Sequence, residues 1–163
     1  MLAALLLAAP AAAQEAAVDT PAAEPEAAPL LQGACRDGSL WWADGASAGL
    51  APCESPGEGF FTLACEGGTT TMRFLSPYPV AVDQRGTADL TVDGRSFRLE
   101  GIGADDARTG QRVLADIAVP LDALEALAGG DQARLDGPAE TRPFHLTGSG
   151  GAIAALRQAC QEG

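Results

Sequence analysis

The pattern that most constrains the fold is a two-residue alternation of apolar and polar side chains, which covers most of the chain after Gly33. Successive side chains of a strand point to opposite faces, so this alternation predicts strands with one buried face. The firmest case is a hairpin in which Asp93-Gly94 supplies a type I′ turn. Its inward-facing residues are Ala88, Leu90, Val92, Phe97 and Leu99. The sequence therefore predicts a mainly β protein.

The same alternation predicts a second hairpin and two further strands. The hairpin covers residues 60–74 and turns at residues 66–68, with Arg73 pointing outward. The further strands cover residues 112–119 and 140–146. The inward-facing residues of these segments are Phe61, Leu63, Cys65, Met72, Phe74, Val113, Ile117, Val119, Phe144 and Leu146.

Two short helices accompany the strands. The first is expected over residues 120–130, which begin with a proline that the first turn of a helix tolerates and which contain a helix stop at Gly129. The second is expected over residues 152–160. The residues expected to face the core are Leu121, Leu124 and Ala128 in the first helix, and Ile153, Leu156 and Cys160 in the second. Short strands with one or two helices predict an antiparallel β-sandwich or a partly open barrel.

The N-terminal segment is typical of an exported protein. Residues 1–13 form an apolar run that is too short to span a bilayer and ends in three alanines, which predicts a cleaved signal peptide. Residues 14–32 are rich in Ala, Pro and Glu and lack aromatic and basic residues, which predicts a disordered linker. Residues 33–163 then form a single β-rich domain of a periplasmic or secreted protein, without an integral membrane segment.

Four cysteines, Cys35, Cys53, Cys65 and Cys160, are expected to form two disulfides, because thiols oxidise outside the cytoplasm. Four cysteines allow three pairings, and the sequence leaves the choice open. We favour Cys35 with Cys53 and Cys65 with Cys160, which in the chain-entropy model contribute about 3 and about 4–5 kcal/mol to stability. The cysteines lack the clustered spacing of a metal site, so we expect neither a metal nor a cofactor.

The chain is acidic, with a net charge of −12, ten arginines and no lysine. Binding to nucleic acid or to anionic lipid depends on basic side chains that neutralise phosphates, so this charge argues against both partners. A basic protein partner stays open.

Single polar residues give no catalytic constellation. His145, the only histidine, alternates with apolar neighbours and is expected on the surface of its strand rather than as a catalytic base. Ser149 precedes a helix and is expected as its N-cap, with an anion at that helix N-terminus as the alternative. Asp105 and Asp106 lack the spacing of a calcium loop and are expected in a solvated turn.

Trp41 and Trp42 are adjacent in a chain with only 5% aromatic residues. On a strand they would point to opposite faces, so one can enter the core while the other stays at the surface. An exposed tryptophan beside a disulfide loop is a candidate anchor for a protein or glycan partner. The alternative, which we favour, is that both cover edges of the core.

Four segments within residues 60–160 resemble a group of exported bacterial β-sandwich proteins: LACEGGTTTMRF, TVDGRSFRL, VPLDALEALAGGDQARLD and PFHLTGSGGAIAALRQAC. The group includes the TagO/VasI-like proteins associated with type VI secretion and, more loosely, the invasion-associated locus B family. The C-terminal match rests on Phe144, Leu146, Gly148, Leu156, Ala159 and Cys160. The resemblance implies an exported non-enzymatic domain, and it favours the pairing of Cys65 with Cys160.

Part of the chain is also similar to C-type lysozyme inhibitors, which are small barrels. The matching residues are Cys65, Gly67, Gly68, Thr70, Arg73, Phe74, Asp93, Gly94, Arg95, Phe97 and Leu99. That family enters the lysozyme cleft with a Ser-Gly-x-x-Tyr stretch, whereas the corresponding segment here is GADDARTG.

These patterns lead to one main functional hypothesis and two alternatives. The main hypothesis is an exported, non-enzymatic binding or accessory protein of the bacterial cell envelope, associated with secretion and acting on a protein partner. The alternatives are a periplasmic inhibitor of a lysozyme-like wall hydrolase, and a hydrolase whose paired carboxylates are brought together by folding. No triad, metal cluster or phosphate loop in the sequence supports catalysis.

Overall fold

The computed structural model of the 163-residue chain describes residues 31–56, 59, 61–75, 80–107, 110–137 and 143–162. The expected signal peptide and nearly all of the expected linker lie outside these residues. The described chain starts in the short strand β1, Leu31–Gln32, two residues before the domain boundary expected at Gly33.

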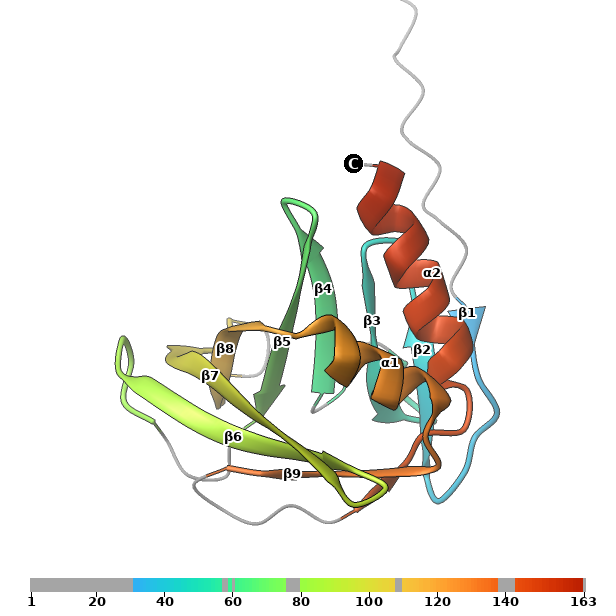
Figure 1. The fold of residues 1–163 in the computed structure, drawn as a ribbon, viewed down its shortest axis with the longest axis horizontal. Coiled ribbons are helices and arrows are strands. Elements are labelled where there is room, and N and C mark those ends of the chain that lie inside the picture. The colour runs from blue at the N-terminus through green and yellow to red at the C-terminus, as the bar shows by residue number, and fades with distance from the viewer. Residues whose placement is uncertain are drawn as a thin grey trace, which may run out of the picture.

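Ten antiparallel strands form one sheet in the order β1-β2-β3-β4-β5-β8-β7-β6-β9-β10, and the sheet curls into a half-barrel (Figure 1). The remaining strands are β2 Ser39–Ala43, β3 Ser47–Pro52, β4 Phe61–Glu66, β5 Thr69–Leu75, β6 Arg85–Val92, β7 Arg95–Asp105, β8 Arg112–Ala118, β9 Gln132–Asp136 and β10 Phe144–His145. Both predicted hairpins are present, as β4–β5 and β6–β7. The prediction of a partly open antiparallel barrel with two helices is confirmed.

The concave face of the sheet holds the main core. One row of buried side chains crosses five adjacent strands, because the register places its members opposite one another. Its members are Trp41, Leu50, Phe61, Phe74 and Leu114. The ring centroids of Trp41 and Phe61 lie 5.6 Å apart in an edge-to-face arrangement, which is a favoured aromatic geometry.

Glycines make the strong curl of the β6–β7 hairpin possible. Gly86 and Gly101 face each other across the hairpin at inward positions. A Cβ atom at Gly101 would lie 2.6 Å from the carbonyl oxygen of Ala115, and one at Gly86 would lie 2.8 Å from a methyl carbon of Leu114. Side chains at these positions would therefore push β8 away from the hairpin.

Helices α1, Leu121–Gly129, and α2, Ser149–Glu162, pack against each other, and α2 also contacts β2, β3 and β4 (Figure 1). As expected, Ile153 and Leu156 of α2 are buried in the core. Neither helix of the described chain is long and apolar enough to cross a membrane.

The expected core face of α1 is wrong in one residue. Its buried stripe consists of Ala123, Leu124 and Leu127, whereas Leu121 is 56% exposed. At 3.6 residues per turn, Leu121 lies roughly a third of a turn away from the centre of this stripe. The first helical residue therefore faces solvent, although it is apolar.

Both favoured disulfides are present. Cys35 is bonded to Cys53 with a Cα–Cα distance of 5.7 Å, and Cys65 is bonded to Cys160 with a Cα–Cα distance of 5.5 Å. The first joins the chain just before β2 to the chain just after β3. The second fastens the C-terminal part of α2 to β4.

The two leucines of α1 give a matched test of its orientation. Leu124→Ala is expected to lower the free energy of unfolding by about 2–5 kcal/mol, because it leaves a cavity in the core. Leu121→Ala is expected to change it by less than about 0.5 kcal/mol. Urea unfolding of the oxidised protein measures both values, and equal losses would show that α1 is rotated relative to this description.

Candidate functional site

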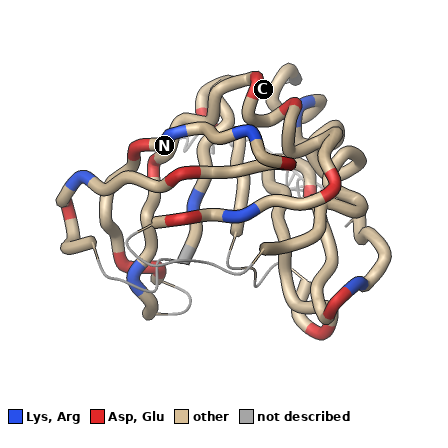
Figure 2. The backbone as a smooth tube through the Cα atoms, turned by 60° about the horizontal axis from the view of Figure 1, so that its bottom comes forward, with Lys and Arg blue, Asp and Glu red and all other residues tan. Residues whose placement is uncertain are grey.

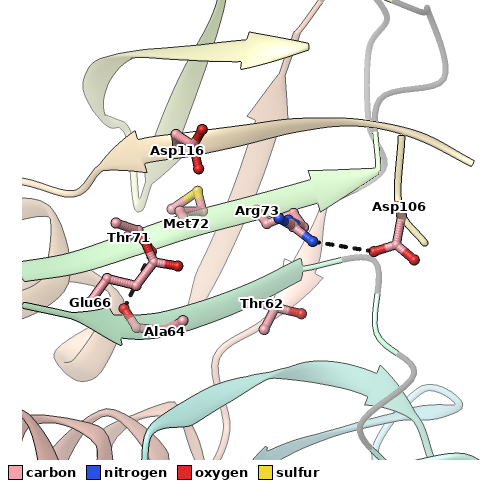
Figure 3. A pocket seen from close by; sticks show the side chains of 8 residues that line it. All are labelled: Thr62, Ala64, Glu66, Thr71, Met72, Arg73, Asp106 and Asp116. Atoms are coloured by element: carbon pink, nitrogen blue, oxygen red, sulfur yellow. Dashed lines mark hydrogen bonds and ion pairs between the residues drawn. The ribbon is translucent and has the colours of Figure 1, made fainter. Parts of the chain in front are cut away.

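A groove on the outer face of the sheet is the candidate functional site (Figure 3). It has a volume of about 290 Å³ and lies over β4, β5 and β8. Its lining residues are Thr62, Ala64, Glu66, Thr71, Met72, Arg73, Asp106 and Asp116. Most of its surface is polar, because it is built from the residues that the strands direct away from the core.

The alternation of β4 and β5 explains this lining. Thr62 on β4 and Arg73 on β5 are cross-strand partners, and both stand between residues that point into the core. Side chains of such a pair lie on the same face of the sheet, so they meet on the outside. The pattern that buries Phe61 and Phe74 therefore also builds the floor of the groove.

A β-bulge places Asp116 at the groove. The pairing of β5 with β8 shifts between Met72 and Phe74, so that two residues of β8 lie opposite Arg73. Asp116 is one of these two and has a φ of 55°, in the left-handed region that aspartate tolerates better than most residues. Bulges redirect side chains, and here the carboxylate of Asp116 is exposed beside the groove.

Arg73 and Asp106 form an ion pair at one end of the groove, with 3.7 Å between Nη1 of Arg73 and Oδ2 of Asp106 (Figure 3). Asp106 is buried, and its backbone N–H donates to the carbonyl oxygen of Gln111 at 2.8 Å. Asp106 was expected in a solvated turn, and this expectation is wrong because its carboxylate lines the groove and pairs with Arg73. The neighbouring Asp105 is exposed and accepts from Nε of Arg112 at 2.7 Å.

The charges in the groove are unevenly distributed. Its lining includes three carboxylates and one guanidinium, and this guanidinium is close to Asp106. Figure 3 shows Glu66 and Asp116 toward the opposite end, beside Thr71. Among the residues that the structure describes, that end therefore carries the uncompensated negative charge, in a protein that is acidic as a whole (Figure 2).

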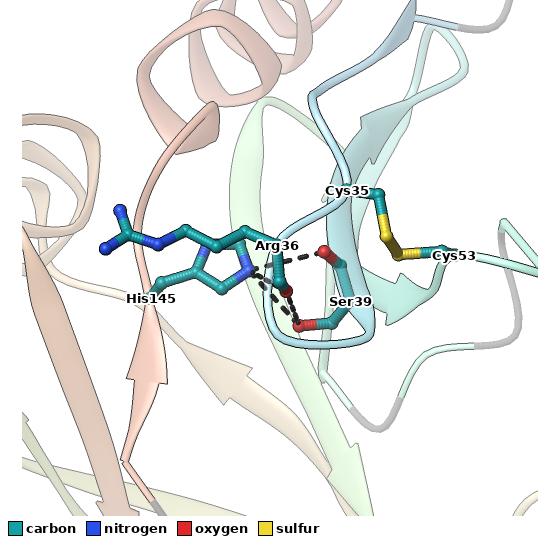
Figure 4. Close-up of a disulfide and its surroundings, with 5 residues drawn as sticks. All are labelled: Cys35, Arg36, Ser39, Cys53 and His145. Atoms are coloured by element: carbon teal, nitrogen blue, oxygen red, sulfur yellow. Dashed lines mark hydrogen bonds between the residues drawn. A yellow bond between two sulfur atoms is a disulfide. The ribbon is translucent and has the colours of Figure 1, made fainter.

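A second polar cluster surrounds His145, where the two ends of the curled sheet meet (Figure 4). Nε2 of His145 lies 2.9 Å from the carbonyl oxygen of Arg36, 3.3 Å from that of Ser39 and 3.2 Å from the Ser39 hydroxyl. Nε1 of Trp41 donates to the carbonyl oxygen of His145 at 3.0 Å. We call this set of contacts the seam, since it joins the turn before β2 to β10.

His145 was expected at the surface, and this expectation is wrong: the residue is 8% exposed. The alternation does put it on the face opposite Phe144. That face is covered, however, because the turn of residues 36–39 packs against it.

The seam contains a serine next to a histidine, yet its hydrogen bonds do not fit a catalytic base. Carbonyl oxygens only accept, so the Nε2 atom that lies between two of them carries the proton. A base for Ser39 would need a lone pair on this atom. Nδ1, the atom that an orienting carboxylate would hold in a triad, is buried and has no hydrogen-bond partner among the described residues.

Both tryptophans are buried, so the hypothesis of an exposed indole as a partner anchor is wrong. Trp41 belongs to the main core, and Trp42 points to the other face of β2, as the alternation predicts. There Trp42 is only 3% exposed and packs with Leu40, Ala51 and Cys53 in a small second cluster. The alternative that both residues cover the core fits the structure better than the exposed anchor.

Ser149 was expected to cap α2, and it has a different role. Its hydroxyl lies 2.7 Å from the carbonyl oxygens of both Leu127 and Leu146, to which it acts as donor. A capping side chain would instead accept from a backbone N–H. Ser149 is buried and links the start of α2 to α1 and to the end of β10.

Within the described parts of the chain, no group of three or more His, Cys, Asp or Glu residues could hold a metal ion. The groove itself was not predicted from the sequence. The outward positions of Thr62, Thr71 and Arg73 were readable from the alternation, but the bulge that brings Asp116 beside them was not.

The fold and these sites define a class: an acidic, disulfide-bonded antiparallel half-barrel with a polar groove on its outer face. A solved structure that resembles it is that of invasion associated protein B from Bartonella henselae, with a TM-score of 0.45 and 13% sequence identity. The match covers 85% of this chain and 98% of the other. In the sequence, the resemblance to the invasion-associated locus B family is weaker than that to the TagO/VasI-like proteins.

No family model matches the chain, and no curated protein matches it. The resemblances to the TagO/VasI-like proteins and to the C-type lysozyme inhibitors therefore stay predictions.

The seam predicts a difference between two substitutions of His145. His145→Ala removes the donor to the Arg36 carbonyl and is expected to lower the free energy of unfolding by about 1–3 kcal/mol. His145→Gln places an amide N–H near the position of Nε2 and is expected to retain a substantial part of that stability. Urea unfolding distinguishes them, and equal losses for both variants would contradict this role of the hydrogen bond.

Proposed function

We propose that this protein is an exported, non-catalytic accessory protein of the bacterial cell envelope, which binds a positively charged segment of a protein partner in the groove over β4, β5 and β8. The observation that carries the proposal is the polar groove with its uncompensated carboxylates, Glu66 and Asp116.

Two features support a location outside the cytoplasm. All four cysteines are paired in disulfides, which persist in oxidising compartments and are rare in the cytosol. The N-terminal sequence, with its apolar run and small-residue ending, is the second feature.

The groove favours a cationic segment over a neutral or anionic one. Arg73 offsets the charge of Asp106 at one end of the groove. At the other end, the carboxylates of Glu66 and Asp116 attract an incoming lysine or arginine side chain. The groove also offers threonine hydroxyls, Thr71 near Glu66 and Thr62 across from Arg73, which can accept and donate hydrogen bonds to a backbone or side chain. Complementary charge of this kind speeds association and selects partners.

A non-catalytic role is supported by the hydrogen bonds of the only histidine. Its Nε2 atom donates to backbone carbonyls in the seam and is engaged in holding the fold. A secretion-associated role is the version of the proposal that the resemblance to the TagO/VasI-like family favours. A wall hydrolase inhibitor is the alternative, which the partial resemblance to the C-type lysozyme inhibitors favours.

Charge-removing substitutions in the groove test the proposal. Glu66→Gln and Asp116→Asn are each expected to weaken binding of a short Lys/Arg-rich peptide by about three- to five-fold at low salt, because an exposed ion pair contributes up to about 1 kcal/mol. Asparagine also tolerates the left-handed backbone at position 116. NMR titration of the oxidised protein measures the affinity and maps the contact.

The matched control is Asp89→Asn, which removes the same charge from an exposed position on β6. It is expected to leave the affinity within about two-fold. Peptide-induced shifts spread evenly over the surface, or equal losses for all three variants, would show attraction by net charge alone. A C-type lysozyme assay run in parallel identifies the inhibitor alternative, in which the wild-type protein blocks wall hydrolysis and the groove variants do so less.

A further inference from the structure

The two disulfides differ in how accessible they are. Cys35 is exposed and Cys53 is half-buried. Cys65 and Cys160 are both half-buried, and Cys65 packs against the main core. Thiol–disulfide exchange needs access to a sulfur atom, so the first disulfide is the easier target for a reductant.

The exposed disulfide lies at the start of the seam (Figure 4). Arg36 follows Cys35 directly, and its carbonyl oxygen accepts the hydrogen bond from Nε2 of His145 at 2.9 Å. The Arg36 side chain also reaches the chain just after β10, with 2.9 Å between its Nη1 and the hydroxyl of Thr147. One residue beside the disulfide thus makes two of the contacts that close the half-barrel.

Little else holds this turn in place. Residues 34–38 are all exposed, so burial of apolar surface contributes little to their position. Their backbone is held by the pairing of Arg36 with Ser39 and by a bond from Cys53 N–H to the carbonyl oxygen of Gly38 at 3.1 Å. The disulfide is the covalent part of this attachment.

We infer that the Cys35–Cys53 disulfide is a redox latch: a dithiol reductant opens it selectively, which releases the turn of residues 34–38 and loosens the seam while the rest of the domain stays folded. This conformational device is independent of what the groove binds.

The chemistry is ordinary thiol–disulfide exchange. A thiolate of the dithiol attacks the Cys35 sulfur, the S–S bond breaks, and Cys53 leaves as a thiolate that takes up a proton from solvent. The second thiol of the reductant then displaces Cys35 from the mixed disulfide. Two electrons pass to the protein, which gains two thiols, and the dithiol is oxidised to a disulfide.

The rest of the fold has its own supports. The β2 strand keeps its ladder with β3, and β3 keeps its ladder with β4. The second disulfide, Cys65–Cys160, continues to hold α2 against β4. Opening is therefore confined to the seam and to the turn before β2.

Stepwise reduction of the oxidised protein with dithiothreitol tests the inference. Thiols are trapped with iodoacetamide at each concentration, and peptide mass spectrometry identifies which cysteines have been freed. Cys35 and Cys53 are expected to be freed at least about ten-fold faster than Cys65 and Cys160. Simultaneous opening of both disulfides, or earlier opening of Cys65–Cys160, would overturn the inference.

His145 reports on the seam, since it is the only histidine and gives a single set of imidazole NMR signals. In the oxidised protein the Nε2–H tautomer is expected, and in the partly reduced protein a mixture of both tautomers. Amide exchange at Gly33, Arg36 and Ser39 is expected to rise at least about ten-fold, with no change in β6 and β7. An unchanged tautomer with unchanged exchange after reduction would refute a latch.

Serine variants separate the two disulfides. Cys35→Ser with Cys53→Ser is expected to reproduce the signals of the partly reduced protein, whereas the control pair Cys65→Ser with Cys160→Ser is expected to leave the His145 tautomer unchanged. If the first pair does not fold, the wild-type protein trapped after reduction of Cys35–Cys53 is measured instead. Opening limited to the seam supports the latch, whereas loss of the whole fold shows that the entire domain requires this disulfide and overturns the inference.

Discussion

The closure of the curled sheet by side chains is the interaction on which the rest of this structure depends. The end strands β1 and β10 have only two residues each and do not pair with one another. The gap is closed instead by the indole N–H of Trp41, which donates to the carbonyl oxygen of His145, and by the ring contacts of Phe61 with Trp41 and Phe144. Without this closure the concave face would lie open to water, and its apolar rows would lose the burial that stabilises them.

The groove follows from the same closure, because β4 and β5 bury one face against the core and present the other to solvent. Met72 and Phe74 are drawn into the core, and this fixes Thr71 and Arg73 on the outside. A change in the register of β5 by one residue would exchange the two sets. The bulge in β8 interrupts the regular alternation, and it adds a carboxylate at a place that a regular strand would not supply.

Local features of the sequence predicted most of the fold, and tertiary contacts decided the rest. The β6–β7 hairpin was predictable because Asp93-Gly94 sets the turn and thereby the register. Both favoured disulfide pairings are present, although the sequence left the choice among three pairings open. The burial of His145 was not predictable, since it depends on a turn more than one hundred residues away in sequence. The second face of Trp42 is covered for a similar reason, because alternation gives the face of a residue but not what covers that face. Leu121 was misplaced for another reason, because the spacing of apolar residues in α1 did not decide which stripe of the helix faces the core.

The distribution of charge connects the fold to the proposed binding role. Five arginines, at positions 36, 73, 95, 112 and 134, form ion pairs with nearby aspartates within the described chain. Such pairs contribute little to stability when exposed, but they neutralise the basic side chains locally. The acidic excess is therefore carried by carboxylates outside these pairs, rather than being balanced across the surface. A hollow such as the groove, which gathers several carboxylates over a low-dielectric sheet, concentrates this field where a cationic segment can lie against it.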